Sequence, residues 1–94
     1  MANAVGFRQC KLFENVTAGV QTIVDDSQRG AGSFLLFEVT NATATDGYFI
    51  VNDMPENGHP GTKIPVPKGT TRQIPMMVVC FNVTQVMTVV AYGM

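Results

Sequence analysis

The residues best suited to chemistry are Asp53, Glu56 and His59, two acids and the chain's one histidine at intervals of three. On a helix this spacing would bring the three side chains to one face, where they could hold a metal ion or act as acid and base. Two prolines and two glycines within residues 55–61 exclude a helix. The segment also lacks the alternating oxygen ligands of an EF-hand loop. We therefore expect a solvated loop with no metal ligand.

No nucleophile has a recognisable base beside it. Ser27 and Ser33 lie in or next to a glycine-containing loop, but neither belongs to a GxSxG nucleophile elbow. Asp25 and Asp26 are adjacent loop charges rather than an acid and a base facing each other across a cleft. The phosphate-binding patterns GxxxxGK[ST] and GxGxxG are missing. We expect no catalytic residue, no cofactor and no enzymatic activity.

Cys10 and Cys80 are the two cysteines of the chain. In a cytosolic protein such cysteines are usually reduced, buried thiols, so a disulfide bridge between them is the less favoured interpretation. Asn15, Asn41 and Asn82 begin Asn-X-Thr sequons. Because no secretory signal is recognisable, these asparagines are interpreted as residues of turns and strand edges.

The composition limits the classes of partner. Hydrophobic residues make up 46% of the chain and charged residues 14%, against a usual charged fraction of roughly 25%. The six basic residues are scattered and the formal net charge is -1, which argues against a nucleic-acid surface. No apolar stretch approaches the ~18 residues that a membrane-spanning helix needs. We expect synthesis in a cytoplasm, no membrane association, and a surface that binds protein.

The dominant hydrophobic period is two, so we expect an all-β chain in which residues 1–94 form a single domain, a small antiparallel β-sandwich or β-barrel of about seven strands. An irregularity is expected near Gln9, where the apolar parity changes. Residues 63–66 and 70–74 are predicted to form a hairpin. The other predicted strands cover residues 5–13, 20–24, 33–40, 48–51 and 76–92, the last divided near 82–85.

The stretch from Glu56 to Thr71 holds three prolines and the histidine. Its first part, residues 56–62, is predicted to be a loop. Pro65 and Pro67 cannot donate hydrogen bonds to a neighbouring strand, which predicts an edge strand, and Pro67 with Gly69 suits a tight turn.

Two predicted strands are apolar on both faces. Residues 33–40 alternate Phe34 and Leu36 with Leu35 and Phe37, and residues 76–90 are apolar almost throughout. An antiparallel sheet normally leaves one face to water, so either the chain's own arms or another subunit must cover the second face. We predict an interface that contains Phe7, Phe34, Leu36, Met76 and Val78.

From Val39 onward, the runs VTNATATDGYFIVNDMPENGHPGTKIPVPKGTTRQI and VMTVVAYGM resemble a pattern in small structural proteins of tailed bacteriophages. The pattern consists of a strand that ends in a Thr-Asn turn, a short strand that ends in Asn or Asp, a glycine-containing loop, the strand-turn-strand IPVPKGTT, and a Val-rich last strand. These features cover a little over half of the chain, and the first 38 residues do not match.

The resemblance implies a non-enzymatic virion protein, foremost a capsid decoration or cement protein that buries apolar β-surface against neighbouring subunits. Its expected partners are the major capsid protein or other virion proteins, with further copies of itself as a homo-oligomer. A component of the tail or of the head-to-tail connector is the first alternative. A small carbohydrate- or ligand-binding module is the second, although the chain has two tyrosines and no tryptophan to stack on sugars.

Overall fold

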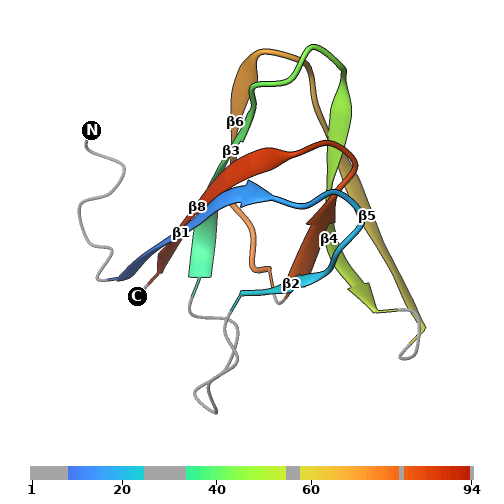
Figure 1. Cartoon of the computed structure of the whole chain (residues 1–94). Coiled ribbons are helices and arrows are strands. Elements are labelled where there is room, and N and C mark those ends of the chain that lie inside the picture. The colour runs from blue at the N-terminus through green and yellow to red at the C-terminus, as the bar shows by residue number, and fades with distance from the viewer. Residues whose placement is uncertain (1–8, 25–33, 55–57, 79, 94) are drawn as a thin grey trace.

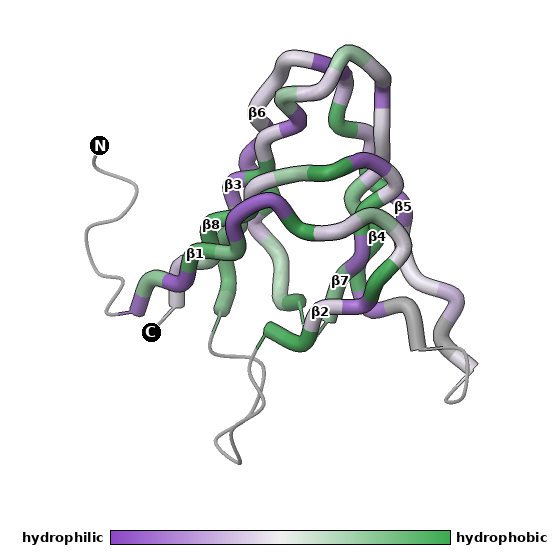
Figure 2. Tube along the Cα trace, viewed as in Figure 1, coloured by the Kyte–Doolittle hydropathy of each residue, from purple (hydrophilic) through white to green (hydrophobic). Residues whose placement is uncertain are grey.

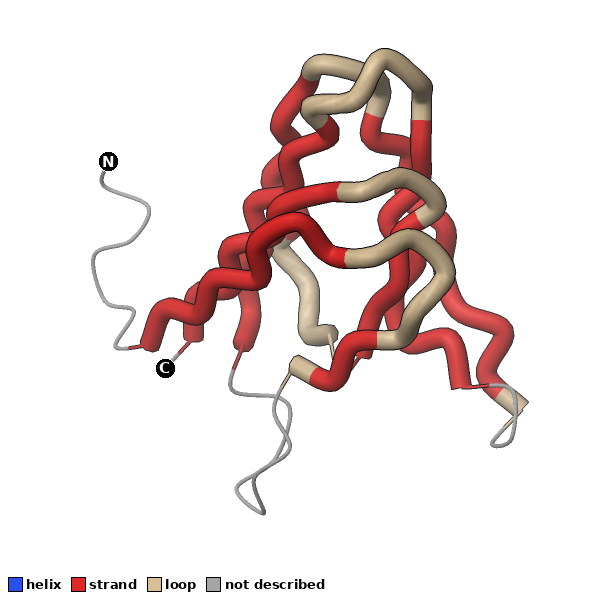
Figure 3. Tube along the Cα trace, in the orientation of Figure 1, coloured by secondary structure: helices blue, strands red, loops and turns tan. Residues whose placement is uncertain are grey.

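The computed structural model describes residues 9–24, 34–54, 58–78 and 80–93, and these residues form two four-stranded antiparallel sheets (Figure 1). The all-β prediction is confirmed, and no helix occurs in the described part of the chain (Figure 3). The strands are β1 (Gln9–Val16), β2 (Thr22–Ile23), β3 (Phe34–Asn41), β4 (Gly47–Met54), β5 (His59–Val66), β6 (Thr70–Ile74), β7 (Cys80–Val83) and β8 (Met87–Gly93).

The strand order is that of a jelly roll. Sheet A has the order β1-β8-β3-β6 and sheet B the order β2-β7-β4-β5. The first strand therefore pairs with the last, the second with the seventh, the third with the sixth and the fourth with the fifth. This is one long antiparallel hairpin folded over on itself, the arrangement of double-sheet jelly rolls.

The predicted hairpin of residues 63–74 is wrong. A tight turn does join the two segments, with the Thr70 amide donating to the Pro67 carbonyl at 3.2 Å. Beyond that turn, however, β5 pairs with β4 in sheet B, and β6 pairs with β3 in sheet A. The prolines at 65 and 67 lack the amide donors that a ladder beside the turn would need, so the turn carries the chain from one sheet to the other.

β5 is the edge strand of sheet B, as its prolines predict. It begins at His59, so the predicted loop of residues 56–62 is wrong in its second half. There the backbone of His59 pairs with Met54 and that of Pro60 with Asp53. An edge strand tolerates Pro60 because the missing amide can lie on the unpaired side.

The core lies between the two sheets and is centred on aromatic side chains. The ring centroid of Phe49 lies 4.9 Å from that of Phe81, both in sheet B. It lies 6.2 Å from that of Phe37 in sheet A. Phe13 of β1 meets Phe81 edge to face at 5.4 Å. Edge-to-face and tilted pairs at these distances add to the hydrophobic stabilisation of the burial itself. The aromatic residues thus connect the two sheets.

Two irregularities change which side chains face the core. The register of β3 against β8 shifts between Phe34 and Leu36, so that Phe34 is buried with Phe37 instead of sharing a face with Leu36. In β1 the register shifts between Phe13 and Val16, where Asn15 has a φ of 51°. The irregularity predicted near Gln9 involves residues 5–8, which lie outside the described residues.

Asn41, at the end of β3, is fully buried and joins the two turns that cross between the sheets. Its side-chain Nδ2 donates to the carbonyls of Thr45 and Val66, both at 2.9 Å. Its Oδ1 accepts from the amide of Thr43 at 3.0 Å and from the Thr43 hydroxyl at 2.6 Å. Its own carbonyl accepts from the Gly69 amide at 2.7 Å. The β3–β4 and β5–β6 connections are therefore held together by one residue.

Replacing Asn41 with Ala should lower the free energy of unfolding by about 2–4 kcal/mol, because buried carbonyls lose their donor. Asn41→Asp should lower the free energy of unfolding at least as much, since an ionised carboxylate cannot donate to the carbonyls of Thr45 and Val66. Urea denaturation measures both values. The control is Thr40→Ala, which removes an exposed hydroxyl pair with Thr71 and should cost less than about 1 kcal/mol. Equal losses for Asn41→Ala and the control would contradict this role.

Candidate interaction surfaces

The outer face of sheet A is a surface of mixed apolar and polar character, and we call it face A. The register places three rows of side chains side by side on it, because residues directly opposite in an antiparallel sheet point to the same side. The rows are Cys10–Tyr92–Leu36, then Leu12–Val90–Glu38–Gln73, and then Thr88–Thr40–Thr71.

The apolar part of face A lies at its β1 end. Leu12 is 59% exposed, and Leu36, Val90 and Tyr92 beside it are half-buried. The hydropathy colouring of Figure 2 shows apolar residues interspersed with polar ones along β1 and β8. This end of face A therefore lacks the polar outer side that is usual for an antiparallel sheet in water.

A hydrogen-bonded carboxylate lies at the centre of face A. Glu38 accepts from the Tyr92 hydroxyl at 2.9 Å through Oε1 and from the Gln73 amide at 3.0 Å through Oε2. The hydrogen bond to Glu38 raises the pKa of Tyr92 above its ordinary value, and desolvation and the Glu38 charge add to this. Both donors are neutral, so the negative charge of Glu38 remains available to a partner.

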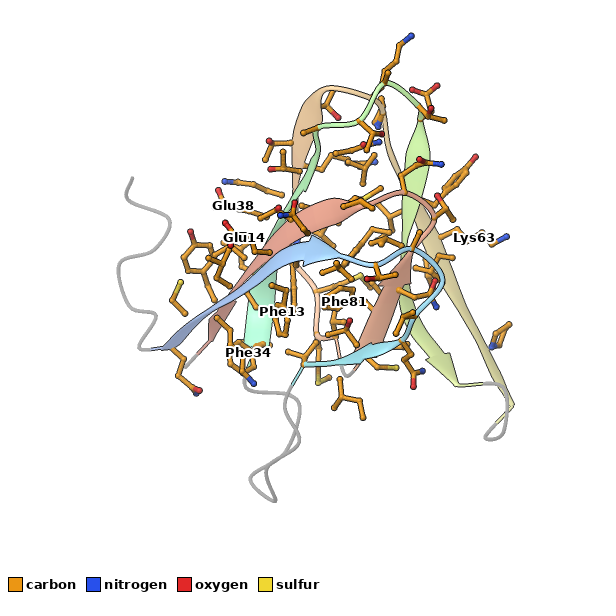
Figure 4. The ribbon with its side chains drawn as sticks, viewed as in Figure 1. Phe13, Glu14, Phe34, Glu38, Lys63 and Phe81 are labelled. Atoms are coloured by element: carbon orange, nitrogen blue, oxygen red, sulfur yellow. The ribbon has the colours of Figure 1, made fainter. Side chains whose placement is uncertain are left out.

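Face A has acidic but no basic side chains among the described residues. Figure 4 shows Glu14 of β1 on the same side of the molecule as Glu38. Lys11, although it belongs to β1, alternates to the other side of the strand, where its Nζ donates to the Val24 carbonyl at 2.7 Å. That ammonium also lies 5.9 Å and 5.8 Å from the ring centroids of Phe13 and Phe34. Because the Lys11 ammonium lies on the other side of β1, it does not neutralise the negative charge of face A.

The outer face of sheet B, which we call face B, has the opposite charge. Its rows are Tyr48–Pro65, Lys63–Ile50–Asn82 and Cys80–Ile23. Ile23 and Tyr48 are 56% and 46% exposed. Lys63 is the charged residue among the described side chains of these rows, and Figure 4 shows it on the side of the molecule away from Glu14 and Glu38. Face B is therefore apolar and basic.

The side chains considered for chemistry lie outside the part of the chain that the structure describes. The backbones of Asp53 and His59 belong to β4 and β5, but their side chains, like Glu56, lie outside the described residues, as do Asp25, Asp26, Ser27 and Ser33. Among the described residues there is no group of three or more His, Cys, Asp or Glu that could hold a metal ion.

The two cysteines lie in different sheets and do not form a disulfide bridge with each other. Cys80 is buried as expected, and its Sγ accepts a hydrogen bond from the Gln21 amide at 3.3 Å. Cys10 is exposed on face A, which corrects the expectation that both thiols are buried. The reason is that β1 is an edge strand whose outer side has no neighbouring layer among the described residues.

The five residues predicted to form an interface have different positions. Phe34 and Val78 are 3% and 0% exposed within the core, so in this conformation they leave no surface for a partner. Met76 is half-buried and packs against the core, Leu36 lies on face A, and Phe7 lies outside the described residues. The β3 bulge moves Phe34 inward, and Val78 precedes β7 in a segment without strand alternation. Of the four that the structure describes, Leu36 alone belongs to face A.

Sequence reasoning missed Leu12, Val90 and Tyr92 as neighbours of Leu36. Leu12 and Val90 are apolar residues at outward-facing positions of β1 and β8, a pattern visible in the sequence. What the sequence does not show is that the first and last strands pair with each other, because that contact joins opposite ends of the chain.

The Glu38–Tyr92 hydrogen bond predicts a pH-dependent difference between variants. In a Tyr48→Phe background Tyr92 is the one tyrosine left to titrate. Adding Glu38→Gln should lower the pKa of Tyr92, measured by phenolate absorbance. Because the folded-state pKa is raised, the bond stabilises the fold below about pH 10 and the stabilisation is lost as pH rises through the folded pKa. An unchanged tyrosine titration curve would contradict the bond.

Comparison of the chain with protein-family models, with curated proteins and with solved structures finds no match. The described part of the chain also contains no helix that could cross a membrane. What can be inferred about function therefore depends on the topology of the sandwich and on the chemistry of faces A and B.

Proposed function

We propose that this protein is a non-enzymatic structural component of a virion, foremost a capsid decoration protein. The observation that carries the proposal is the exposed apolar area on the outer sides of a small sandwich, with Leu12, Ile23 and Tyr48 each close to half exposed or more. Apolar surface of this kind commonly marks a site of contact with another protein.

The topology supports the proposal by analogy. Jelly rolls with two four-stranded sheets occur in viral capsid domains, and also in lectins. A fold alone does not imply a function, so the analogy has weight only together with the surface chemistry. The resemblance of residues 39–94 to phage structural proteins points in the same direction.

The mechanism would be stabilisation by binding. A decoration protein that binds the assembled shell and not its separated subunits shifts the equilibrium towards the shell by mass action. Covering apolar surface contributes about 25 cal/mol per Å², and specific contacts commonly bury ~1,600 Å² in total. Many weak contacts repeated over a shell can therefore have a large combined effect.

The proposal is tested on purified particles. Quantitative mass spectrometry should find the chain as a component of fixed stoichiometry, and electron microscopy of particles labelled on this chain should place it on the shell. Labelling confined to the tail or to the head-to-tail junction would support the alternative of a tail component instead. Absence of the chain from purified particles would overturn both.

A charge on face A should prevent incorporation without unfolding the protein. Leu36→Asp places a carboxylate among Cys10, Tyr92 and Glu38, and burying it against a neighbour would cost several kcal/mol. We expect incorporation to fall at least about tenfold while the circular dichroism melt of the free protein changes little. Ala44→Asp, an exposed change in the β3–β4 connection, is the matched control. Normal incorporation of a folded Leu36→Asp protein would show that face A is not buried in the particle.

A further inference from the structure

We infer that copies of this chain associate head to tail, with face A of one copy against face B of the next. The occupant of each face is thus a second copy of the same protein. The inference goes beyond the proposed function because self-association of the purified chain requires no virion.

The first argument is charge complementarity. Face A has Glu38 near its centre and Glu14 on the same side, with no base among the described residues. Face B has Lys63 between Ile50 and the open edge of the sheet, with no acid among the described side chains of its rows. A contact between unlike faces would pair Glu38 with Lys63, and the low local dielectric of a covered surface strengthens that attraction.

The same charges argue against symmetric contacts. A two-fold contact of face A with face A would bring four carboxylates into one covered surface, and face B with face B would oppose Lys63 to Lys63. Like charges held together out of water cost several kcal/mol. A contact that uses different faces avoids this and is heterologous, so it repeats from copy to copy instead of ending at a dimer.

The second argument is the match of apolar and polar zones. In both faces apolar side chains border the charged position: Leu12, Val90 and Leu36 lie around Glu38, and Ile50 and Pro65 lie beside Lys63. Sheets that pack face to face bury such side chains in a layer about 10 Å thick. Both faces belong to antiparallel sheets of equal strand number, so their widths are similar.

The third argument is area. Four strands ~4.8 Å apart and about six residues long give a face of roughly 19 by 20 Å. One such contact covers roughly 380 Å² on each copy and about 760 Å² in total, which is below the ~1,000 Å² threshold for a specific interface and fits a weak contact. In a head-to-tail assembly each copy makes two contacts, one through each face, and ring closure would make the second contact intramolecular.

The test is a charge exchange on the purified full-length chain, read by light scattering coupled to gel filtration over a range of concentrations. The wild-type protein should form oligomers whose mass rises with concentration or reaches a fixed ring size. Glu38→Lys and Lys63→Glu should each raise the apparent dissociation constant at least about tenfold. The double variant Glu38→Lys/Lys63→Glu should restore assembly, because the pair is reversed and not removed.

Lys68→Glu is the matched control, since Lys68 is an exposed lysine of the β5–β6 turn and lies on neither face. It changes the net charge by the same amount as Lys63→Glu and should leave assembly unchanged. Thermal melts followed by circular dichroism identify any variant that fails to fold, and Glu38→Gln then serves as the milder substitution on face A. It should weaken assembly in the same direction.

A wild-type protein that stays monomeric at millimolar concentration would overturn the inference. So would single variants that assemble normally, or a folded double variant that remains dissociated, because the two side chains would then not face each other. Assembly in solution together with absence from particles would leave the inference standing and overturn only the proposed virion role.

Discussion

The fold depends on satisfying the polar groups of the backbone where the chain crosses from one sheet to the other, and the fully buried Asn41 does this. Its side-chain amide donates to the carbonyls of Thr45 and Val66, in the β3–β4 turn and at the end of β5. Its side-chain oxygen accepts from the Thr43 amide, and its backbone carbonyl accepts from the Gly69 amide of the β5–β6 turn. A buried carbonyl without a donor costs more than a typical hydrogen bond contributes. These hydrogen bonds fix the β3–β4 and β5–β6 connections. As a result β3 pairs with β6 in sheet A, β4 pairs with β5 in sheet B, and the aromatic residues are enclosed between the two sheets.

The closed core leaves two outer faces of different chemistry. Because side chains alternate along a strand, the residues that fill the core determine which residues must lie outside. In β1 this alternation turns Lys11 towards the Val24 carbonyl and the rings of Phe13 and Phe34, and leaves Leu12 exposed. The same alternation in β5 buries Val66 and turns Lys63 outward. The opposite charges of faces A and B are thus a consequence of core packing, and they make contact between unlike faces more favourable than contact between like ones.

Much of the fold could be predicted from local patterns. The patterns of residues 33–40 and 76–92 indicated strands, and Pro65 and Pro67 indicated an edge, because these signals act within a few residues. The partners of the strands could not be predicted in this way. IPVPKGTT has the composition of a hairpin, yet the turn joins two sheets, and Phe34 has the parity of Leu36, yet a bulge turns it into the core. The bulge lies between Phe34 and Leu36, so the two residues of the predicted interface face opposite ways. Leu36 lies on the outer face, and Phe34 lies in the core.

By itself, the sequence determined the class of the fold, the edge position of β5 and the excess of apolar over charged side chains. Each of these follows from composition or from short-range periodicity. The tertiary structure decided that the first and last strands pair, and with them that Leu12, Val90, Tyr92 and Leu36 form one surface around Glu38. It also decided that Lys63 lies on the other side. These placements join residues dozens of positions apart, and long-range pairing is selected by burial and hydrogen bonding of the whole chain rather than by any local signal.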